Sequence, residues 1–512
     1  MPDETSPDTR SDPGSDDIQL IMAEQCGRPT VRVRIRPSMA KGACRLLAAL
    51  LLPGLAACGF QRYAPAALDH ATVPRTTAEA RLDDPALEAL LQRVDADAPT
   101  PAATWTPARL GVVAVARSRA VDEARAAVVA ARARQRVAVQ RENPQLNLTV
   151  EHHSEEEDFS DSNWSIGPGL SLMLQPPSRR RLAGERSAIE VSLARIDMLE
   201  SAWRARDAAY AAALELAAQR EQAALGERVT AARSVAVDAA RALVAAGVTD
   251  SFEWQTMALE SNAARLDQLN LVIGSAAATA DLAAALAMPL AALEGLRVDA
   301  AAPVAMPAYA ELQREVLRTH PRVLRALAEY DRAERDLALA VAAQYPAIEL
   351  NPGYFLDQGD SVWSLFGGVV VPLFASHDAA IASAAAARDL AREHFHAEQA
   401  ATLAELQRAH ANWQAALRVL DAASGIAREV ARTHAELAGK QAEGIVDRLS
   451  VARAAVQMAE VEAQLAVCAA RARQGRARFD AAARTPLLDP VFGRYLLELD
   501  TGASADAEGD AP

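Results

Sequence analysis

The chain has 512 residues and a formal net charge of −14, and it is 51% hydrophobic but only 4% aromatic. Alanine leads the apolar residues and has the best helix propensity, so the composition favours long packed helices. It argues against an all-β sandwich, which needs β-branched and aromatic residues. The acidic balance argues against binding to nucleic acid.

The N-terminal segments predict export and lipidation. Residues 1–38 are polar and rich in Pro and Asp, and we interpret them as an upstream non-structural extension. Residues 39–57 join two basic residues to an apolar run too short to cross a bilayer, which is typical of a signal peptide. Their end, Leu55-Ala-Ala-Cys58, resembles the bacterial lipobox and implies lipidation of Cys58. An ordinary signal peptide with an incidental Cys58 is the alternative. Residues 58–105 are expected to be an N-terminal tether.

The rest of the chain repeats one unit of about 200 residues. Three pairs of phrases recur 202, 199 and 197 residues apart: Asn143-Pro with Tyr345-Pro, Trp164-Ser with Trp363-Ser, and Ala246-Gly with Glu443-Gly. We therefore expect a first repeat over 106–300, a second repeat over 301–487 and a disordered tail over 488–512. Each repeat is predicted to run helix, two strands, long helix, tight turn, helix.

The predicted helices are unusually long. Residues 178–246 and 375–443 carry no proline, and at 1.5 Å per residue each would span roughly 100 Å. Four shorter helices are expected at 106–142, 252–288, 308–344 and 446–485. Apolar residues recur every seven positions at Ile189, Ile196, Trp203 and Tyr210, which predicts a coiled-coil column. Helices of this length must pack side by side, because they have no single globular core.

Four segments of about ten residues alternate between apolar and small polar side chains, two in each repeat. This length and alternation fit tilted strands that cross a membrane with their apolar face toward lipid. A half-buried sheet in a soluble domain is the alternative. Four strands cannot close a wide barrel, so a barrel would need several copies of the chain. The residues expected to face lipid are Leu146, Leu148, Trp164, Ile166, Leu170, Leu172, Ile348, Leu350, Trp363, Leu365, Val369 and Val371.

This layout resembles the TolC-like family of outer-membrane efflux proteins over residues 85–487. The phrases that carry the resemblance are Trp203-Arg-Ala-Arg206, the run His320–Tyr330, and Pro352-Gly-Tyr-Phe-Leu-Asp-Gln-Gly359. The last two are most similar to the heavy-metal (CzcC-type) branch.

The resemblance implies a fold that is mainly α with a small β part. Long antiparallel coiled-coil helices and four transmembrane β-strands would be completed in a homotrimer as an α/β barrel tunnel. It further implies a lipid-anchored conduit in the outer membrane that extends into the periplasm and docks on a periplasmic adaptor and an inner-membrane pump. Such a conduit is not an enzyme and needs no cofactor, and the sequence does not reveal its cargo.

The turns after the two long helices are the expected periplasmic mouth. A glycine there permits the left-handed turn that ends a helix. In the family an aspartate in a Val-Asp-x-Leu-Asp phrase narrows the pore; the matching run here is Val446-Asp-Arg-Leu-Ser450, in which a serine replaces the second aspartate. A pore-lining aspartate and a plain helix start both remain open. The residues of this tip or gate are Gly247, Asp250, Gly444, Asp447 and Arg448.

The sequence gives little indication of a metal site or of catalysis. The loop from Glu151 to Asp161 holds two adjacent histidines among several acids, but a solvated outer loop explains it better than a cation site, so we expect no metal. No nucleophile–base or phosphate-loop pattern supports catalysis, and no catalytic residue is assigned. The alternative function is a periplasmic coiled-coil lipoprotein with a scaffold or adaptor role. The paired strands discriminate, because a scaffold does not need them.

Overall fold

A computed structural model describes residues 61–95, 104–153, 163–248, 250–300, 306–357, 360–369 and 377–505. The chain divides into two units, residues 1–70 and 71–512. Residues 61–70 of the first unit contain no helix or strand, and every element below belongs to the second. The predictions on residues 1–58, including Cys58, and on Val371 fall outside the described residues.

The second unit is mainly helical. The first repeat contains α4 (Pro107–Arg117), α5 (Arg119–Ala138), α6 (Pro177–Ala245), α7 (Ser251–Ala285) and the 3-10 turn η1 (Leu290–Leu293). The second contains α8 (Tyr309–Thr319), α9 (Pro321–Ala342), α10 (Asp378–Ala442) and α11 (Arg448–Ala483). Helices α2 (Thr72–Ala78) and α3 (Pro85–Val94) precede the repeats, and α12 (Pro490–Ala505) follows them. None of the helices in the described residues has the length and apolarity needed to cross a membrane.

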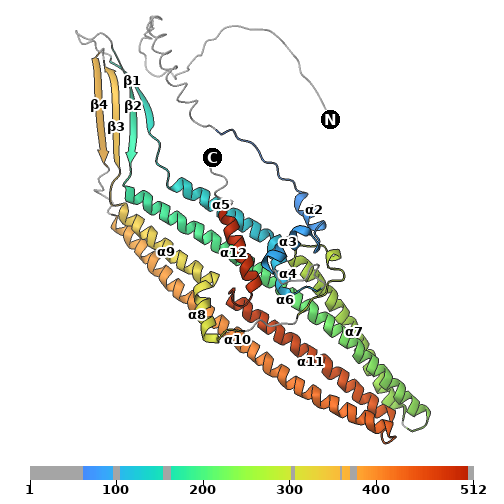
Figure 1. Ribbon diagram of the computed structural model, residues 1–512. Coiled ribbons are helices and arrows are strands. Elements are labelled where there is room, and N and C mark those ends of the chain that lie inside the picture. Colours follow the sequence, from blue (N-terminus) through green and yellow to red (C-terminus); the bar gives the residue numbers. More distant parts are fainter. Residues whose placement is uncertain are drawn as a thin grey trace, which may run out of the picture. The chain divides into compact units, whose positions relative to one another are not determined.

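The long helices form a layer whose core lies between neighbouring columns. Helix α6 packs on α5 and α9 in one half of its length and on α7 and α11 in the other, and α10 packs on α9 and α11 (Figure 1). Two shorter helices thus lie end to end beside each long one. Within this unit the strands lie at one end of the layer, and the α6–α7 and α10–α11 turns lie at the other (Figure 1). The mainly helical fold expected from the sequence is confirmed.

Two expected helices are each broken once. The segment 106–142 forms α4 and α5, because Ser118 is extended (ψ 116°) and caps α5 by accepting from the Val121 amide. The segment 308–344 forms α8 and α9, because a proline disfavours the helical conformation at the residue before it, here His320 (ψ 126°). The breaks lie 202 positions apart, the same offset as the repeat. Helix α6 has the expected 69 residues, whereas α10 begins at Asp378 and has 65.

The strands β1 (Gln145–His152), β2 (Trp164–Leu174), β3 (Ile348–Asp357) and β4 (Asp360–Val369) form one antiparallel sheet in the order β1-β2-β3-β4. Directly opposite residues share a face. The register places Leu146 opposite Leu170, Leu172 opposite Leu350 and Ile348 opposite Val369. The described members of the apolar set therefore lie on one face, as the alternation predicts. Strand β4 starts three residues before Trp363, the first residue of this strand expected to face lipid.

The predicted tether and the predicted tail each contain a packed helix. Helix α3 buries Leu87, Leu91 and Val94, and α12 buries Phe492, Tyr495, Leu496 and Leu499. The prediction of a disordered tail over 488–512 is wrong for α12, and the predicted tether over 58–105 contains the packed helix α3. Both helices carry apolar residues at helical spacing, and that stripe is buried against the repeats. Residues 506–512 lie outside the described residues.

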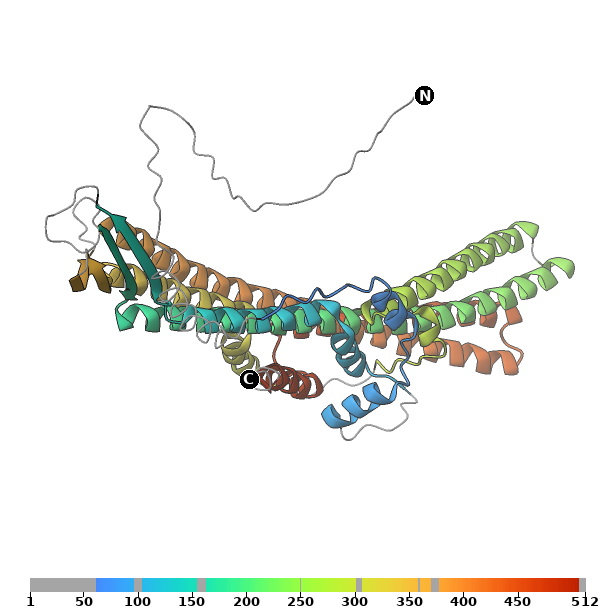
Figure 2. The same ribbon diagram turned by 90° about the horizontal axis from the view of Figure 1, so that it is seen from above.

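The short helices α3, α8 and α12 lie on one face of the layer (Figure 2). Helices α3 and α12 share a core with α4, α6 and α7. Helix α8 buries Leu312 and Val316 against Leu406 of α10 and Phe479 of α11. We call this side of the layer the covered face and the opposite side the open face.

Candidate functional site

The apolar face of the sheet is exposed in the single chain. Leu146 is 65% exposed, Trp363 82% and Leu365 72%. On the other face Ser165 is buried, and the Ser171 hydroxyl donates to Glu349 at 3.0 Å. A continuous apolar surface of this kind indicates contact with lipid or with another protein.

The other face of the sheet is not uniformly polar. Phe355 lies over Gly167, where a Cβ would come within 2.5 Å of the ring. Phe366 of β4 is on the same face by register and is 66% exposed. The small-residue positions of β2 thus make room for an aromatic ring, which the alternation pattern alone does not predict.

Both outer strands of the sheet have an open edge. Strand β1 pairs only with β2 and β4 only with β3 among the described residues. An unpaired edge is a template for pairing with another chain. The sheet is therefore suited to extension by further copies on either side.

The two tips have the same glycine turn. Gly247 and Gly444 adopt φ of +73° and +75°, the left-handed region that favours glycine. At the first tip the Gly247 amide donates to Val244 and the Val248 amide to Leu243, each at 3.0 Å. The second tip repeats this pattern at 2.9 Å. These paired bonds satisfy the last carbonyls of α6 and α10 and reverse the chain sharply.

The tip aspartates cap the returning helices. The Asp250 carboxylate accepts from the Phe252 amide at 2.9 Å, and Asp447 accepts from the Ser450 amide at 2.7 Å and its hydroxyl at 3.2 Å. Asp447 is exposed, so this role leaves it open to solvent. Arg448 is exposed and forms no ion pair with a described residue of the chain.

Ion pairs hold the helices together close to the tips. Arg453 of α11 pairs with Glu253 of α7. Farther along, Arg233 of α6 contacts Glu260 of α7 at 3.1 Å and Glu460 of α11 at 2.5 Å. A core of small residues on α6 and α11, among them Ala236 and Ala240, lets these helices approach closely. The three helices thus form one linked group at this end.

A buried ionic cluster joins α6 to the C-terminal segment. Arg206 is 2% exposed, and its guanidinium donates to Asp489 at 2.6 and 3.1 Å and to Asp207 at 3.0 Å. It also lies 4.4 Å from the centre of the Tyr210 ring. Burial lowers the pKa of Arg206, but the two carboxylates outweigh it, so the pKa is raised and the charge is kept. Burial raises the pKa of nearby Asp480 to about 6, against the opposing effect of Arg476.

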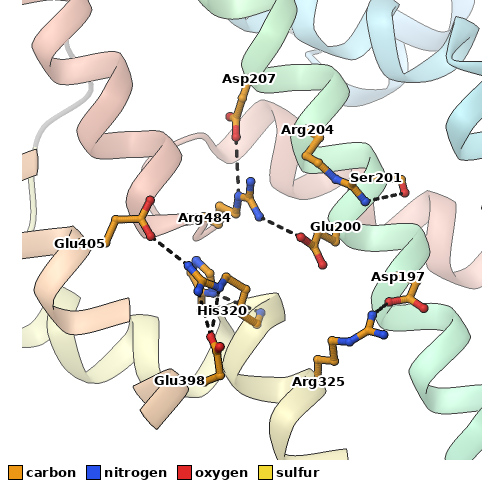
Figure 3. Close-up of polar contacts among 11 residues, drawn as sticks. Asp197, Glu200, Ser201, Arg204, Asp207, His320, Arg325, Glu398, Glu405 and Arg484 are labelled. Carbon is orange, nitrogen blue, oxygen red and sulfur yellow. Dashed lines mark hydrogen bonds and ion pairs between the residues drawn. The ribbon is translucent and has the colours of Figure 1, made fainter. Parts of the chain in front are cut away.

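A belt of ion pairs crosses the layer where α11 ends and α9 begins (Figure 3). Arg484 contacts Glu200 at 3.6 Å and Asp207 at 3.7 Å on α6. Arg322 of α9 contacts two carboxylates of α10, Glu398 and Glu405, each at 3.0 Å. The belt therefore links the first repeat to the second through charge.

His320 lies within this belt and is 4% exposed (Figure 3). Its Nδ1 accepts from the Arg322 amide at 3.2 Å and caps α9. Burial, together with the positive charges of Arg484 and Arg322, lowers the pKa of His320 to about 4. The ring is thus neutral at pH 7.

These clusters were not predicted from the sequence. Arg206 and His320 stand in phrases that carry the family resemblance, yet the sequence gives no reason for their burial. Asp489 before Pro490 is a recognisable helix-start signal, although the sequence analysis predicts a disordered tail there. The sequence offers no signal for Arg484, whose partners lie on a distant helix.

The two histidines expected in an outer loop have separate partners. His152 packs its ring edge-on against Trp164 at 4.6 Å, and His153 lies 3.7 Å from Asp357. The rest of that loop, residues 154–162, lies outside the described residues. In the part of the chain that the structure describes, no group of three or more His, Cys, Asp or Glu side chains is arranged to hold a metal.

Known proteins resemble this chain in structure rather than in sequence. No protein-family model and no curated protein matches it. A crystal structure of a membrane protein from Pseudomonas aeruginosa is 18% identical with a TM-score of 0.60, over 83% of this chain and 96% of that one. CusC, whose structures describe transmembrane channel formation, is 15% identical with a TM-score of 0.59, over 73% and 91%. The open MtrE outer-membrane channel of Neisseria gonorrhoeae is 16% identical with a TM-score of 0.57, over 74% and 89%. The chain therefore has the fold of TolC-like outer-membrane channels. The matched structures do not distinguish a branch among these channels.

Proposed function

We propose that the chain is the outer-membrane channel subunit of an export system, a passive conduit with no chemical step. The observation that carries this is the four-stranded sheet, which has an exposed apolar face and two open edges. A sheet of four strands cannot close on itself around a pore. Pairing β4 of one copy with β1 of the next would close a barrel and turn every apolar face toward lipid. Three copies, the number that the family resemblance implies, would give twelve strands.

The same assembly gives the helices their role. The layers of three copies would enclose a tunnel that continues the barrel into the periplasm. Their six tips would meet at its mouth, where a periplasmic adaptor and an inner-membrane pump would dock. Lipidation at Cys58 would tether each copy to the outer membrane. In this arrangement the apolar face of the sheet contacts lipid, whereas in a periplasmic scaffold the same face would be exposed to water.

Edge pairing can be tested by cysteine cross-linking in outer membranes. Thr149→Cys on β1 and Ser364→Cys on β4 should together give oxidation-dependent covalent dimers and trimers, and neither should do so alone. A second β1 position, Asn147→Cys, covers a shifted register. Ladders that stop at the trimer, together with single channels in planar bilayers, support the proposal. Persistent monomers without channel activity for both β1 positions would exclude it.

Two site assignments are tested separately. Cys58→Ser should abolish palmitate labelling, and normal labelling of the variant would remove the lipid anchor from the proposal. If Asp447 faces the pore, Asp447→Asn should change divalent-cation block and conductance while still capping α11, because Asn is as good a cap as Asp. Asp250→Asn at the other tip is the matched control. If neither variant changes conductance or divalent-cation block, both aspartates are helix caps alone.

A further inference from the structure

A groove between α10 and α11 opens on the open face of the layer. It has a volume of about 730 Å³, and its lining includes Arg408, Asn412, Arg471, Gln474 and Arg478. On α11, Phe479 and Ala483 are buried under α8. Arg471 and Arg478 are seven residues apart, so they lie on one side of α11. This side differs from that of Phe479 and Ala483, and both arginines are exposed. The groove is thus separate from the core beneath the short helices.

The charge of this groove is not neutralised. Arg408, Arg471 and Arg478 form no ion pair or hydrogen bond with a described residue. The carboxylate in the groove, Glu405, is already bound by Arg322 at 3.0 Å. Three arginines without an ion pair to a described residue therefore line one groove in a chain whose net charge is −14.

The neighbouring groups do not offset this charge. Gln474 donates to Glu215 at 2.7 Å, which satisfies that carboxylate at the edge of the groove. Arg484, which also lines the groove, is held by Glu200 and Asp207 at 3.6 and 3.7 Å. Arg408, Arg471 and Arg478 thus remain the arginines of the groove that pair with no described carboxylate.

We propose that this groove binds anions inside the tunnel and that the exported cargo is a small organic anion bearing carboxylate or phosphate groups. The inference rests on the proposed function, since the open face becomes the lumen only in the trimer. The covered face cannot line a tunnel, because α3, α8 and α12 would fill it. With three free arginines per copy, a trimer gathers nine at one level. The guanidinium fork pairs with carboxylate and phosphate oxygens, and a ring of like charge concentrates such ligands.

The test uses the full-length trimer in planar bilayers with citrate and glycerol 3-phosphate as probes. In wild type both probes should block the chloride current, and the reversal potential in a KCl gradient should show anion preference. The variant Arg408→Gln/Arg471→Gln/Arg478→Gln should weaken block by both probes about tenfold, equivalent to about 1.4 kcal/mol, and reduce the anion preference. Replacing the same three residues by Lys should retain most of the block.

The matched control removes equal charge from the covered face. Arg314→Gln/Arg318→Gln/Arg494→Gln changes exposed residues of α8 and α12 and should leave block and selectivity as in wild type. Block by one probe alone assigns the cargo to that acid class. Channels that neither probe blocks, or an equal loss in both triple variants, would overturn the inference while leaving the conduit intact. A wild-type protein that forms no channel would instead refute the proposed function.

Discussion

Replacing Asp489 by Asn should destabilise the protein far more than the same substitution in an equally short ion pair nearer the surface. Asp489 holds the guanidinium of Arg206 at 2.6 Å, and both side chains are at most 6% exposed. Removing one partner of a buried pair costs about 3–5 kcal/mol, because the other charge stays buried without compensation. Asp207 remains at 3.0 Å from Arg206, so we expect a loss near the lower end, about 3 kcal/mol. The asparagine can still cap α12, so the loss of unfolding free energy measures the effect of removing the charge.

The matched control is Asp500→Asn. Asp500 also joins α12 to α6, through Arg195 at 2.7 Å, but both side chains are about one-third exposed (37% and 33%). Solvent and salt screen such a pair, which is worth about 1 kcal/mol or less. The two variants therefore differ in burial rather than in distance or in the helices that they join.

The assay is the free energy of unfolding of the detergent-solubilised protein, followed by circular dichroism. Near-ultraviolet signals should report Trp203, whose ring lies 4.7 Å from Phe492 of α12. Arg206→Met combined with Asp489→Asn should be less destabilising than Asp489→Asn alone, with a coupling energy of at least about 2 kcal/mol. Equal losses for Asp489→Asn and Asp500→Asn, or no coupling, would refute the reasoning from burial.

Three further outcomes are expected. The pKa of His320 is about 4 in the native protein, below its ordinary 6.5, so its contribution is present above pH 6.5 and lost as the pH falls to 4. Relative to His320→Asn, wild type should lose up to about 3 kcal/mol of unfolding free energy across that range; a constant difference would contradict the burial argument. Leu172→Arg should reduce trimer yield and cost about 2–4 kcal/mol if it lies near the bilayer midplane, whereas Ser171→Arg should be milder; the reverse order would show the opposite face toward lipid. Gly444→Ala should destabilise the tip by about 1 kcal/mol because of its positive φ, whereas Gly425→Ala within α10 should stabilise by a similar amount; thermal unfolding of both should give opposite signs.

Local patterns in the sequence were sufficient for the main elements. The alternation of apolar and small polar residues indicated the strands and their apolar face, because side-chain direction in a strand depends only on position along the chain. The proline-free run gave α6 to within one residue, and the glycines at 247 and 444 marked both tips. These features depend on backbone propensity and on neighbours in the chain, which the sequence states directly.

Contacts between distant segments were decided by the tertiary structure. A helix of 16 residues is marginal by itself in water, and α12 is ordered by the apolar contacts of Phe492 and the pairing of Asp489 with Arg206, 283 residues away. The extended residues Ser118 and His320 separate α4 from α5 and α8 from α9. Helix propensity gives no signal for the break at Ser118, whereas Pro321 signals the break at His320.

The arginines illustrate the same division. Arg206, Arg484 and Arg478 are alike in the sequence, each among alanines and other charges. In the fold the first is buried between two carboxylates, the second closes a belt across the repeats, and the third faces an open groove. A charged residue in the sequence requires only that its side chain contact an opposite charge or water. Which of the two it contacts depends on how four columns of helices pack, because that packing fixes the solvation and the partners of each side chain.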